Sequence, residues 1–441
     1  MRTTPAEKTR DYRARGWWGD TRIHDMFDAN ARANPDRLAI VDAPNRADLV
    51  GTPPQRLSFA AAAALVDGYA LSLARLGLGK DDVLVTQLPN IAEYPALYVA
   101  AMRLGIIVSP VPMQFRRHEL EQIVRLTNAK AILTIDQLKG VDQIGIALTL
   151  SADLSKEALT LQVLSLRSAT ATTETPPGAI AFDAAAIDAQ SIAELRSAID
   201  TAAVDADDIA TICWTSGTEG TPKGVPRSHN HWYAISFAHL RGAGIQPGEV
   251  LLNPFPLINM AAIGGCFMSW MHNGGTLVLH HPLDLPTYLK QIAIERPQYA
   301  IAPPALLNML LKNEALLATV DLSSLRCIGS GSAPLDPEMI AGYRDRFGIE
   351  ICNNFGSNEG VSLISNAENA SDPVHRARWF PRFGRDEIQW PSPPPVHIRT
   401  RIINPDTDEE IVDTSKPGEL QITGPTVFDG YYRAPQITAQ S

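Results

Sequence analysis

Hydrophobic and polar positions along this 441-residue chain follow two patterns in turn. From about residue 58 to 165, Ala- and Leu-rich segments with helical spacing alternate with short apolar runs such as 83–88. A second alternating stretch runs from 209 to about 356. Such alternation is typical of parallel sheets with helices on both faces. The chain is therefore expected to be an α/β protein with two parallel-sheet subdomains.

The individual elements follow from the period and the length of each apolar segment. Helices are expected at 23–33, 59–76, 91–103, 118–127, 228–240, 261–272, 285–294 and 304–316. Strands are expected at 38–41, 83–88, 106–111, 131–134, 209–214, 250–253, 276–280, 299–302, 326–329 and 350–353.

Two segments lack this alternation. Residues 166–204 are rich in Thr, Ala, Ser and Pro, which predicts a surface loop or linker. Beyond Phe383 the helical signals fade, and strand-like runs at 396–403 and 418–423 predict a small, barrel-like β subdomain. The expected division is a first α/β subdomain with an N-terminal entry segment, a second α/β subdomain and the β subdomain, at 1–195, 205–380 and 381–441.

The composition of the chain limits the classes of partner and the cellular location that we expect. The net charge of −10 argues against nucleic acid or an anionic membrane as the main partner. No apolar run approaches the ~18–20 residues of a membrane span, and the N-terminus has no apolar signal region, so we expect a cytoplasmic protein. The cysteines have no metal-ligand spacing and are expected to be buried, reduced thiols: Cys213, Cys266, Cys327 and Cys352.

A loop at 214–224, in the second α/β subdomain, carries the most specific chemistry. It follows the apolar run 209–213 and contains hydroxyl residues, glycines and Lys223. Hydroxyl groups and close backbone N–H groups can hold a polyphosphate, and a lysine offsets its charge. The loop differs from a Walker A motif because Lys223 follows Pro222 and precedes Gly224. An ordinary surface turn is the alternative interpretation.

Three further segments follow strand ends, where open α/β sheets bind their ligands. In 354–360, Phe355 can stack on a purine and Glu359 can hold Mg²⁺. Residues 329–335 have small side chains that would let a flat ring approach the backbone. Residues 254–260 form a strand end before a helix. Each segment alone also fits a plain turn.

Residues 216–224, 329–335 and 354–360 together resemble the motifs of the adenylate-forming superfamily, the acyl-CoA synthetases and aryl-acid–AMP ligases. Residues 429–433 resemble the Gly-Tyr element near the end of that family's large domain. The resemblance implies the large AMP-binding domain without the family's C-terminal lid domain and its catalytic lysine. We therefore expect little thioester formation by this chain alone.

The resemblance also implies roles for individual residues. Catalysis would rest on Thr215, Lys223 and Glu359, and Mg²⁺ would be held by Glu359 and Thr215. ATP would contact Thr215, Ser216, Gly217, Thr218, Gly220, Lys223, Gly331, Ser332, Ala333, Pro334, Asn354, Phe355, Gly356, Ser357 and Asn358. The acid would contact Asn259, Met260, Ala261, Gly264, Gly329, Gly331 and Ser357.

Four positions depart from the family pattern. Asn358 replaces the usual Thr, and Asn259 stands where members often carry His. Met260 replaces the Asn that reads a 2-hydroxyl in the aryl-acid branch. Asn354 replaces a common Gly, which would shorten the acyl channel. An apolar pocket for an unadorned aromatic, alicyclic or medium-chain acid is expected.

The implied function is ATP-dependent formation of an acyl-adenylate with release of pyrophosphate, then transfer to coenzyme A. Expected partners are the acid, ATP, Mg²⁺ and coenzyme A, with a homodimer left open. Two alternatives stay open: an aryl-acid–AMP ligase that loads a carrier-protein thiol, and a binding module of the same fold without chemistry. A nicotinamide-dependent Rossmann enzyme lacks its G-x-G-x-x-G signature here.

Overall fold

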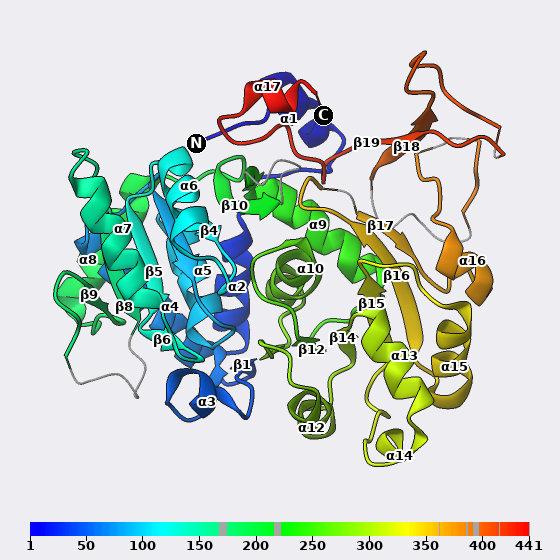
Figure 1. Cartoon of the computed structure of the whole chain (residues 1–441), viewed down its shortest axis with the longest axis horizontal. Helices are drawn as coiled ribbons and strands as arrows, with labels where there is room; N and C mark the ends of the chain where they lie inside the picture. Colours follow the sequence, from blue (N-terminus) through cyan, green and yellow to red (C-terminus); the bar gives the residue numbers. More distant parts are fainter. Residues whose placement is uncertain are drawn as a thin grey trace.

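The computed structural model describes residues 1–166, 174–215, 222–360, 362–384, 387–390, 397–413 and 415–440. Two large sheets lie side by side, with helices between and around them (Figure 1). A separate antiparallel pair, β18 (Arg399–Ile403) and β19 (Glu419–Thr423), extends beyond the second sheet. The predicted α/β class with a small C-terminal β element is confirmed.

The first sheet has seven strands in the order β11-β10-β4-β3-β5-β8-β9. Their bounds are β3 (Val83–Gln87), β4 (Ile107–Pro110), β5 (Ala131–Ile135), β8 (Gln162–Leu166), β9 (Ile180–Phe182), β10 (Ile209–Thr215) and β11 (Lys223–Ser228). The helices α4 (Phe59–Arg75), α5 (Glu93–Arg103), α6 (Arg117–Thr127) and α7 (Gln143–Ser155) belong to this half. The central strands are buried along their whole length, as expected for parallel strands covered on both faces.

The second sheet has eight strands in the order β17-β16-β15-β14-β12-β13-β1-β2. Their bounds are β1 (Leu38–Val41), β2 (Arg56–Ser58), β12 (Val250–Asn253), β13 (Thr276–Leu279), β14 (Tyr299–Ile301), β15 (Cys327–Gly331), β16 (Glu350–Gly356) and β17 (Ser362–Ser365). Its helices include α12 (Leu285–Glu295), α13 (Pro304–Lys312) and α15 (Pro337–Phe347). The remaining short elements are α3 (Arg46–Val50), β6 (Gln137–Leu138), β7 (Val141–Asp142), α14 (Glu314–Leu317), α16 (Pro373–Arg378) and α17 (Pro435–Thr438).

The two halves of the chain exchange strands. β1 lies beside β13 in the second sheet, whereas β10 lies beside β4 in the first. The expectation that each strand belongs to the sheet of its own half of the chain is wrong for these two strands. An apolar run predicts a buried strand but not its partner, because pairing is decided by tertiary contacts between distant segments.

The expected linker at 166–204 is also corrected. Its described part contains β9 and a 14-residue helix, α8 (Ala189–Ala202). Asp188 caps this helix by accepting a hydrogen bond from the Ser191 backbone N–H. The helix buries only small side chains and Leu195, so its apolar period is too weak to stand out in the sequence.

Helices between the sheets form the shared core. These are α2 (Ile23–Ala33), α9 (His229–Gly242), α10 (Met260–Ala262), a π-helical turn η1 (Ile263–Met268) and α11 (Ser269–Asn273). The ring of Trp270 stacks on Phe59 with centroids 5.8 Å apart and also contacts Phe27. The single helix expected at 261–272 therefore contains a π-turn, a feature that recurs at functional sites.

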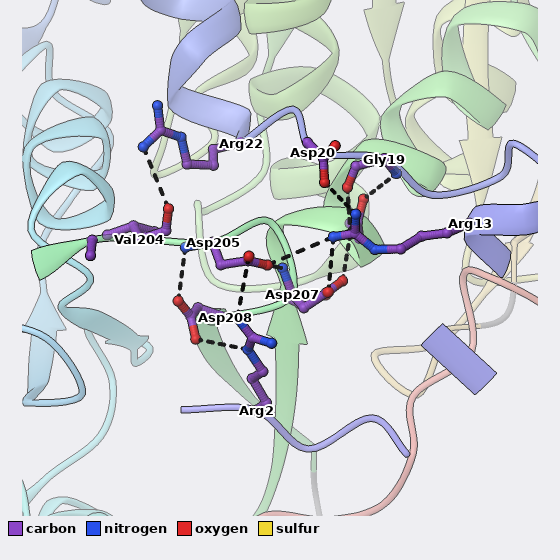
Figure 2. Close-up of polar contacts among 12 residues, drawn as sticks. Arg2, Arg13, Gly19, Asp20, Arg22, Val204, Asp205, Asp207 and Asp208 are labelled. Atoms are coloured by element: carbon purple, nitrogen blue, oxygen red, sulfur yellow. Dashed lines mark hydrogen bonds and ion pairs between the residues drawn. The ribbon is translucent and has the colours of Figure 1, made fainter. Parts of the chain in front are cut away.

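The N-terminal segment is fixed on the start of β10 by charged contacts, which Figure 2 shows. The Arg13 guanidinium donates to Asp207 at 2.9 Å, and Arg2 lies 3.2 Å from Asp205. The Ile209 backbone N–H donates to the Met1 carbonyl. The first helix, α1 (Ala6–Ala14), is thereby held against the strand that leads to Thr215.

The same N-terminal segment holds the C-terminal end of the chain, as the neighbouring α1 and α17 in Figure 1 indicate. Lys8 Nζ lies 2.6 Å from the Asp429 carboxylate, which is almost fully buried. The Trp18 indole N–H donates to the Pro425 carbonyl at 3.2 Å. Residues 425–432 are therefore anchored to the body of the protein.

The four cysteines are buried free thiols, as predicted. Among the residues that the structure describes, no helix has both the length and the apolar character needed to cross a bilayer.

A buried histidine at the start of α9 predicts a pH-dependent stability. Nδ1 of His229 accepts the Ile23 backbone N–H at 3.3 Å, and burial lowers the pKa of His229 to about 4. Below pH ~6.5 the unfolded chain binds a proton that the native state excludes, so stability falls as pH drops towards 4. Between pH 7 and pH 5, this histidine should lower the free energy of unfolding, measured by chemical denaturation, by on the order of 1–2 kcal/mol.

The matched variant is His229→Asn, in which Oδ1 can replace Nδ1 as the acceptor. Its stability should fall less than that of the wild-type protein over the same pH interval. His118→Asn, at an exposed position, is the control and should behave as wild type. Equal losses for wild type and His229→Asn would contradict the assignment.

Candidate active site

The predicted phosphate loop joins the two strands of a β-hairpin. β10 and β11 are antiparallel, and Thr215 is paired with Lys223 at the end of the hairpin next to the loop. Ser216, Gly217, Thr218 and Gly220 lie outside the described residues. The structure therefore places the first and last predicted phosphate contacts, Thr215 and Lys223, on directly opposed strands.

Asn358 connects this hairpin to the two neighbouring segments. Its Nδ2 donates to the Trp214 carbonyl at 2.9 Å, and its Oδ1 accepts the Met260 backbone N–H at 2.9 Å. A carboxamide can donate and accept at once across this width. The replacement of the family's Thr by Asn358 thus has a structural reason.

Arg227, on β11, is the central hydrogen-bond donor of the site. It is 1% exposed, donates to the Thr426 carbonyl at 2.5 Å and also donates to the Asn358 carbonyl. Burial lowers the pKa of Arg227 to about 10, so the side chain is still charged at neutral pH. Gly360 has a positive φ, and a Cβ there would collide with the Thr426 carbonyl. Residues 425–432 therefore lie directly on the loop that carries Glu359.

Glu359 and Lys223 share one neighbour, Tyr431. The Tyr431 hydroxyl donates to Glu359 Oε1 at 3.0 Å, and Lys223 Nζ lies 5.2 Å from the centre of the Tyr431 ring. The Glu359 carbonyl also accepts the Phe428 backbone N–H. Tyr431 therefore links the predicted metal ligand to the predicted phosphate-binding lysine.

The chemistry of these donors fits Mg²⁺. The part of the chain that the structure describes contains no cluster of three His, Cys, Asp or Glu residues that could hold a metal ion. Mg²⁺ is commonly bound through one or two carboxylates together with the phosphates of a substrate. The carboxylate of Glu359 beside the phosphate hairpin is such a set of ligands.

A cavity of about 80 Å³, which we call the acid cavity because several of the predicted acid contacts line it, lies between the helices α9–η1 and the edge of the second sheet. Its walls include Met260, Ala261, Gly265, Ile301, Gly329, Gly331, Asn354 and Phe355. A Cβ at Gly329 would lie 2.5 Å from the Tyr299 hydroxyl, and one at Gly331 would collide with the Asn354 carbonyl. The two glycines are therefore required for the close approach of neighbouring strands.

The predicted acid contacts divide into two groups. Met260, Ala261, Gly329 and Gly331 line the cavity. Asn259 instead caps α10, since its Oδ1 accepts the Ala262 backbone N–H at 3.2 Å. A Cβ at Gly264 would lie 2.5 Å from Ile235 on α9, so this glycine serves helix packing, and Gly265 lines the cavity in its place.

The residues expected to meet adenine lie at the mouth of the cavity. The Phe355 side chain is 48% exposed, with its ring 5.8 Å from that of Phe380. Ser332 lines the cavity with a positive φ, whereas Ala333 and Pro334 are exposed. Ser357 follows on the same loop as a half-buried residue. An aromatic face is thus open to a flat ligand beside the phosphate hairpin.

Several residues of this site were not predicted to have a role. Tyr431 lies in the segment 429–433, whose resemblance to the family is visible in the sequence, and Arg227 closely follows the loop 214–224. His239, Tyr299 and Ser362 lie within apolar helix and strand patterns and give no such signal. A wider hollow of about 860 Å³ between α1 and the β18–β19 side contains none of the predicted site residues.

Comparison with known proteins identifies the family. Residues 27–432 match the AMP-binding enzyme family. The chain belongs to this family. Its fold and motifs are those of the adenylate-forming superfamily, as the sequence predicts. Membership supports ATP-dependent activation of an acid and its ligation to a thiol in general.

Individual relatives are distant in sequence. A probable CoA ligase of Humulus lupulus, CCL5, is 27% identical over 421 residues, which cover 93% of this chain and 68% of the relative. The 2-hydroxy-7-methoxy-5-methyl-1-naphthoate–CoA ligase of Streptomyces carzinostaticus is 25% identical over an alignment that covers 99% of this chain and 73% of the relative. The apo structure of Mycobacterium smegmatis MbtA matches with a TM-score of 0.74 at 22% identity, and the match covers 99% of this chain and 73% of the MbtA chain. The last comparison supports the fold.

Removal of the Arg227 guanidinium should destabilise the protein and loosen this site. Arg227→Met leaves the Thr426 and Asn358 carbonyls without their donor, at a cost of about 2–4 kcal/mol for the two. Denaturant unfolding should show this loss, and the amides of 425–432 should exchange faster with solvent. Arg10→Met, at an exposed position, should change stability by less than about 0.5 kcal/mol. Unchanged exchange at 425–432 in Arg227→Met would contradict the role assigned to this side chain.

Proposed function

We propose that this enzyme converts a compact, largely hydrophobic carboxylic acid to its acyl-adenylate, releases pyrophosphate and, in the complete protein, transfers the acyl group to coenzyme A. The observation that carries this proposal is the meeting of three parts. The hairpin with Thr215 and Lys223, the carboxylate of Glu359 and the mouth of the acid cavity are joined through Asn358 and Tyr431.

The reaction needs no protein nucleophile. An oxygen of the substrate carboxylate attacks the α-phosphorus of ATP, and the bond from that phosphorus to the bridging oxygen of pyrophosphate breaks. Lys223 Nζ and the Thr215 hydroxyl would donate to phosphate oxygens and orient the leaving group. Positioning and charge stabilisation of this kind supply most of the catalysis in phosphate-transfer enzymes.

Glu359 would hold Mg²⁺, which when bound offsets phosphate charge. The Tyr431 hydroxyl fixes one oxygen of this carboxylate and leaves the other oxygen for a cation. The Lys223 ammonium lies over the ring of the same tyrosine. Tyr431 thus contacts both the carboxylate and the ammonium that would face the nucleotide.

The acid cavity favours a compact substrate. Met260, Ala261 and Ile301 supply apolar walls, and the small volume of about 80 Å³ favours a compact acid over a long alkyl chain. A ring or short branched acid fits this space. The relatives that are named CoA ligases support coenzyme A as the acceptor.

Exchange of labelled pyrophosphate into ATP tests the proposal. A panel of benzoates, alicyclic acids and fatty acids should show exchange with one class of compact acids. Glu359→Gln should lower the exchange rate by about 100-fold because the metal carboxylate is lost. Glu338→Gln, an exposed residue on α15, is the matched control. ATP binding without exchange for any acid would contradict adenylation and favour a binding module.

Tyr431→Phe tests the positioning of Glu359. Loss of one hydrogen bond, worth about 1 kcal/mol, should raise the Mg²⁺ concentration for half-maximal exchange about fivefold. The maximal rate at saturating Mg²⁺ should change less. Tyr432→Phe is the control, since the Tyr432 hydroxyl has no hydrogen-bond partner among the described residues. An unchanged Mg²⁺ dependence in Tyr431→Phe would contradict this role.

A further inference from the structure

The acid cavity contains polar groups that an apolar substrate leaves unpaired. Ser362 Oγ and Asn354 Oδ1 are buried and lack a hydrogen-bond partner among the residues described, and both residues line the cavity. The Tyr299 hydroxyl, fully buried beside it, is also without a partner there. Unpaired buried polar groups cost about 1–3 kcal/mol each, so three in one place call for an explanation.

These groups converge on one face of the second sheet. Asn354 is paired with Gly331 on β15 and with Ile364 on β17, so its side chain shares the face of these residues. A Cβ at Gly329 would lie 2.8 Å from Asn354 Nδ2 and 2.5 Å from the Tyr299 hydroxyl. Both polar groups therefore pack against the backbone of Gly329, which lines the cavity.

His239 supplies a polar group from the opposite wall. It projects from α9, lines the cavity, and its Cε1 would lie 3.7 Å from a Cβ at Gly265. Burial lowers the pKa of His239 to about 4, so the imidazole is neutral at pH 7, with one donor and one acceptor nitrogen. The carboxamide of Asn354 and the hydroxyl of Ser362 likewise donate and accept.

The lack of charged residues in the cavity wall limits which chemical groups a ligand can place there. Among the described residues that line the cavity, none is Asp, Glu, Lys or Arg. A second carboxylate or an ammonium group would be desolvated there without a counter-ion, which is strongly unfavourable. A hydroxyl group is neutral and both donates and accepts, so it can pair with these polar groups without a counter-ion.

We propose that Asn354, His239 and Ser362 form a polar subsite that binds a hydroxyl group on the acid, so that the preferred substrate is a compact hydroxylated acid. The proposal rests on the proposed function and replaces the unadorned acid expected from the sequence. Sites built to hydrogen-bond a substrate hydroxyl discriminate strongly against analogues that lack it, because their own polar groups are then unpaired.

Binding of acyl-adenylate mimics tests the subsite without requiring turnover. Benzoyl and cyclohexanecarbonyl sulfamoyl-adenosines, each with and without a hydroxyl at ring positions 2, 3 or 4, would be titrated by calorimetry. At least one hydroxylated mimic should bind tenfold or more tightly than its parent. The ratio of the two affinities should fall below threefold in Asn354→Leu and, independently, in His239→Leu.

Met260→Leu is the matched control, since it changes an apolar wall of the same cavity. It should leave the ratio of hydroxylated to parent affinity unchanged. Equal affinities for every hydroxylated mimic and its parent in the wild-type protein would overturn the subsite but not adenylation. Preference for amino mimics alone would overturn the assignment to a hydroxyl. Failure of all mimics to bind while ATP still binds would overturn the proposed function and the subsite with it.

Discussion

The site depends on one buried cation and the two carbonyls that it binds. Arg227 donates from β11 to Thr426 in the C-terminal segment and to Asn358 in the loop that carries Glu359. The cost of burying a guanidinium is offset only when its hydrogen bonds are made together. Arg227 therefore requires the hairpin, the Glu359 loop and residues 425–432 to be in place at the same time. The N-terminal segment supports this arrangement through Lys8 and Asp429.

Such an arrangement explains why the site lies at a junction of both sheets. The phosphate hairpin closes the edge of the first sheet, whereas Glu359 and the acid cavity belong to the edge of the second. Asn358 connects the two edges with one carboxamide. Rigid support on both sides suits chemistry that relies on positioning rather than on a protein nucleophile.

The sequence predicts the parts of this structure that depend on local pattern. Apolar runs locate the central strands, and dense Gly, Ser, Thr and Lys mark the phosphate loop. Features that depend on distant contacts cannot be predicted in this way. β1 and β10 exchange sheets, and the apolar period of α8 is too weak to indicate a helix. In the site, Asn259 caps a helix although its motif points to the substrate. A shared role for His239 and Ser362 cannot be predicted from sequence, because only strand pairing and helix packing bring them to one cavity.

Hydrogen exchange with and without a bound acyl-adenylate mimic and Mg²⁺ tests the central claim most directly. The claim is that three segments far apart in sequence form one nucleotide site: the hairpin ends around Thr215 and Lys223, the loop 354–360, and the segment 425–432. Ligand should protect the amides of all three together. Protection that is limited to one segment, or that leaves 425–432 unchanged, would contradict this account.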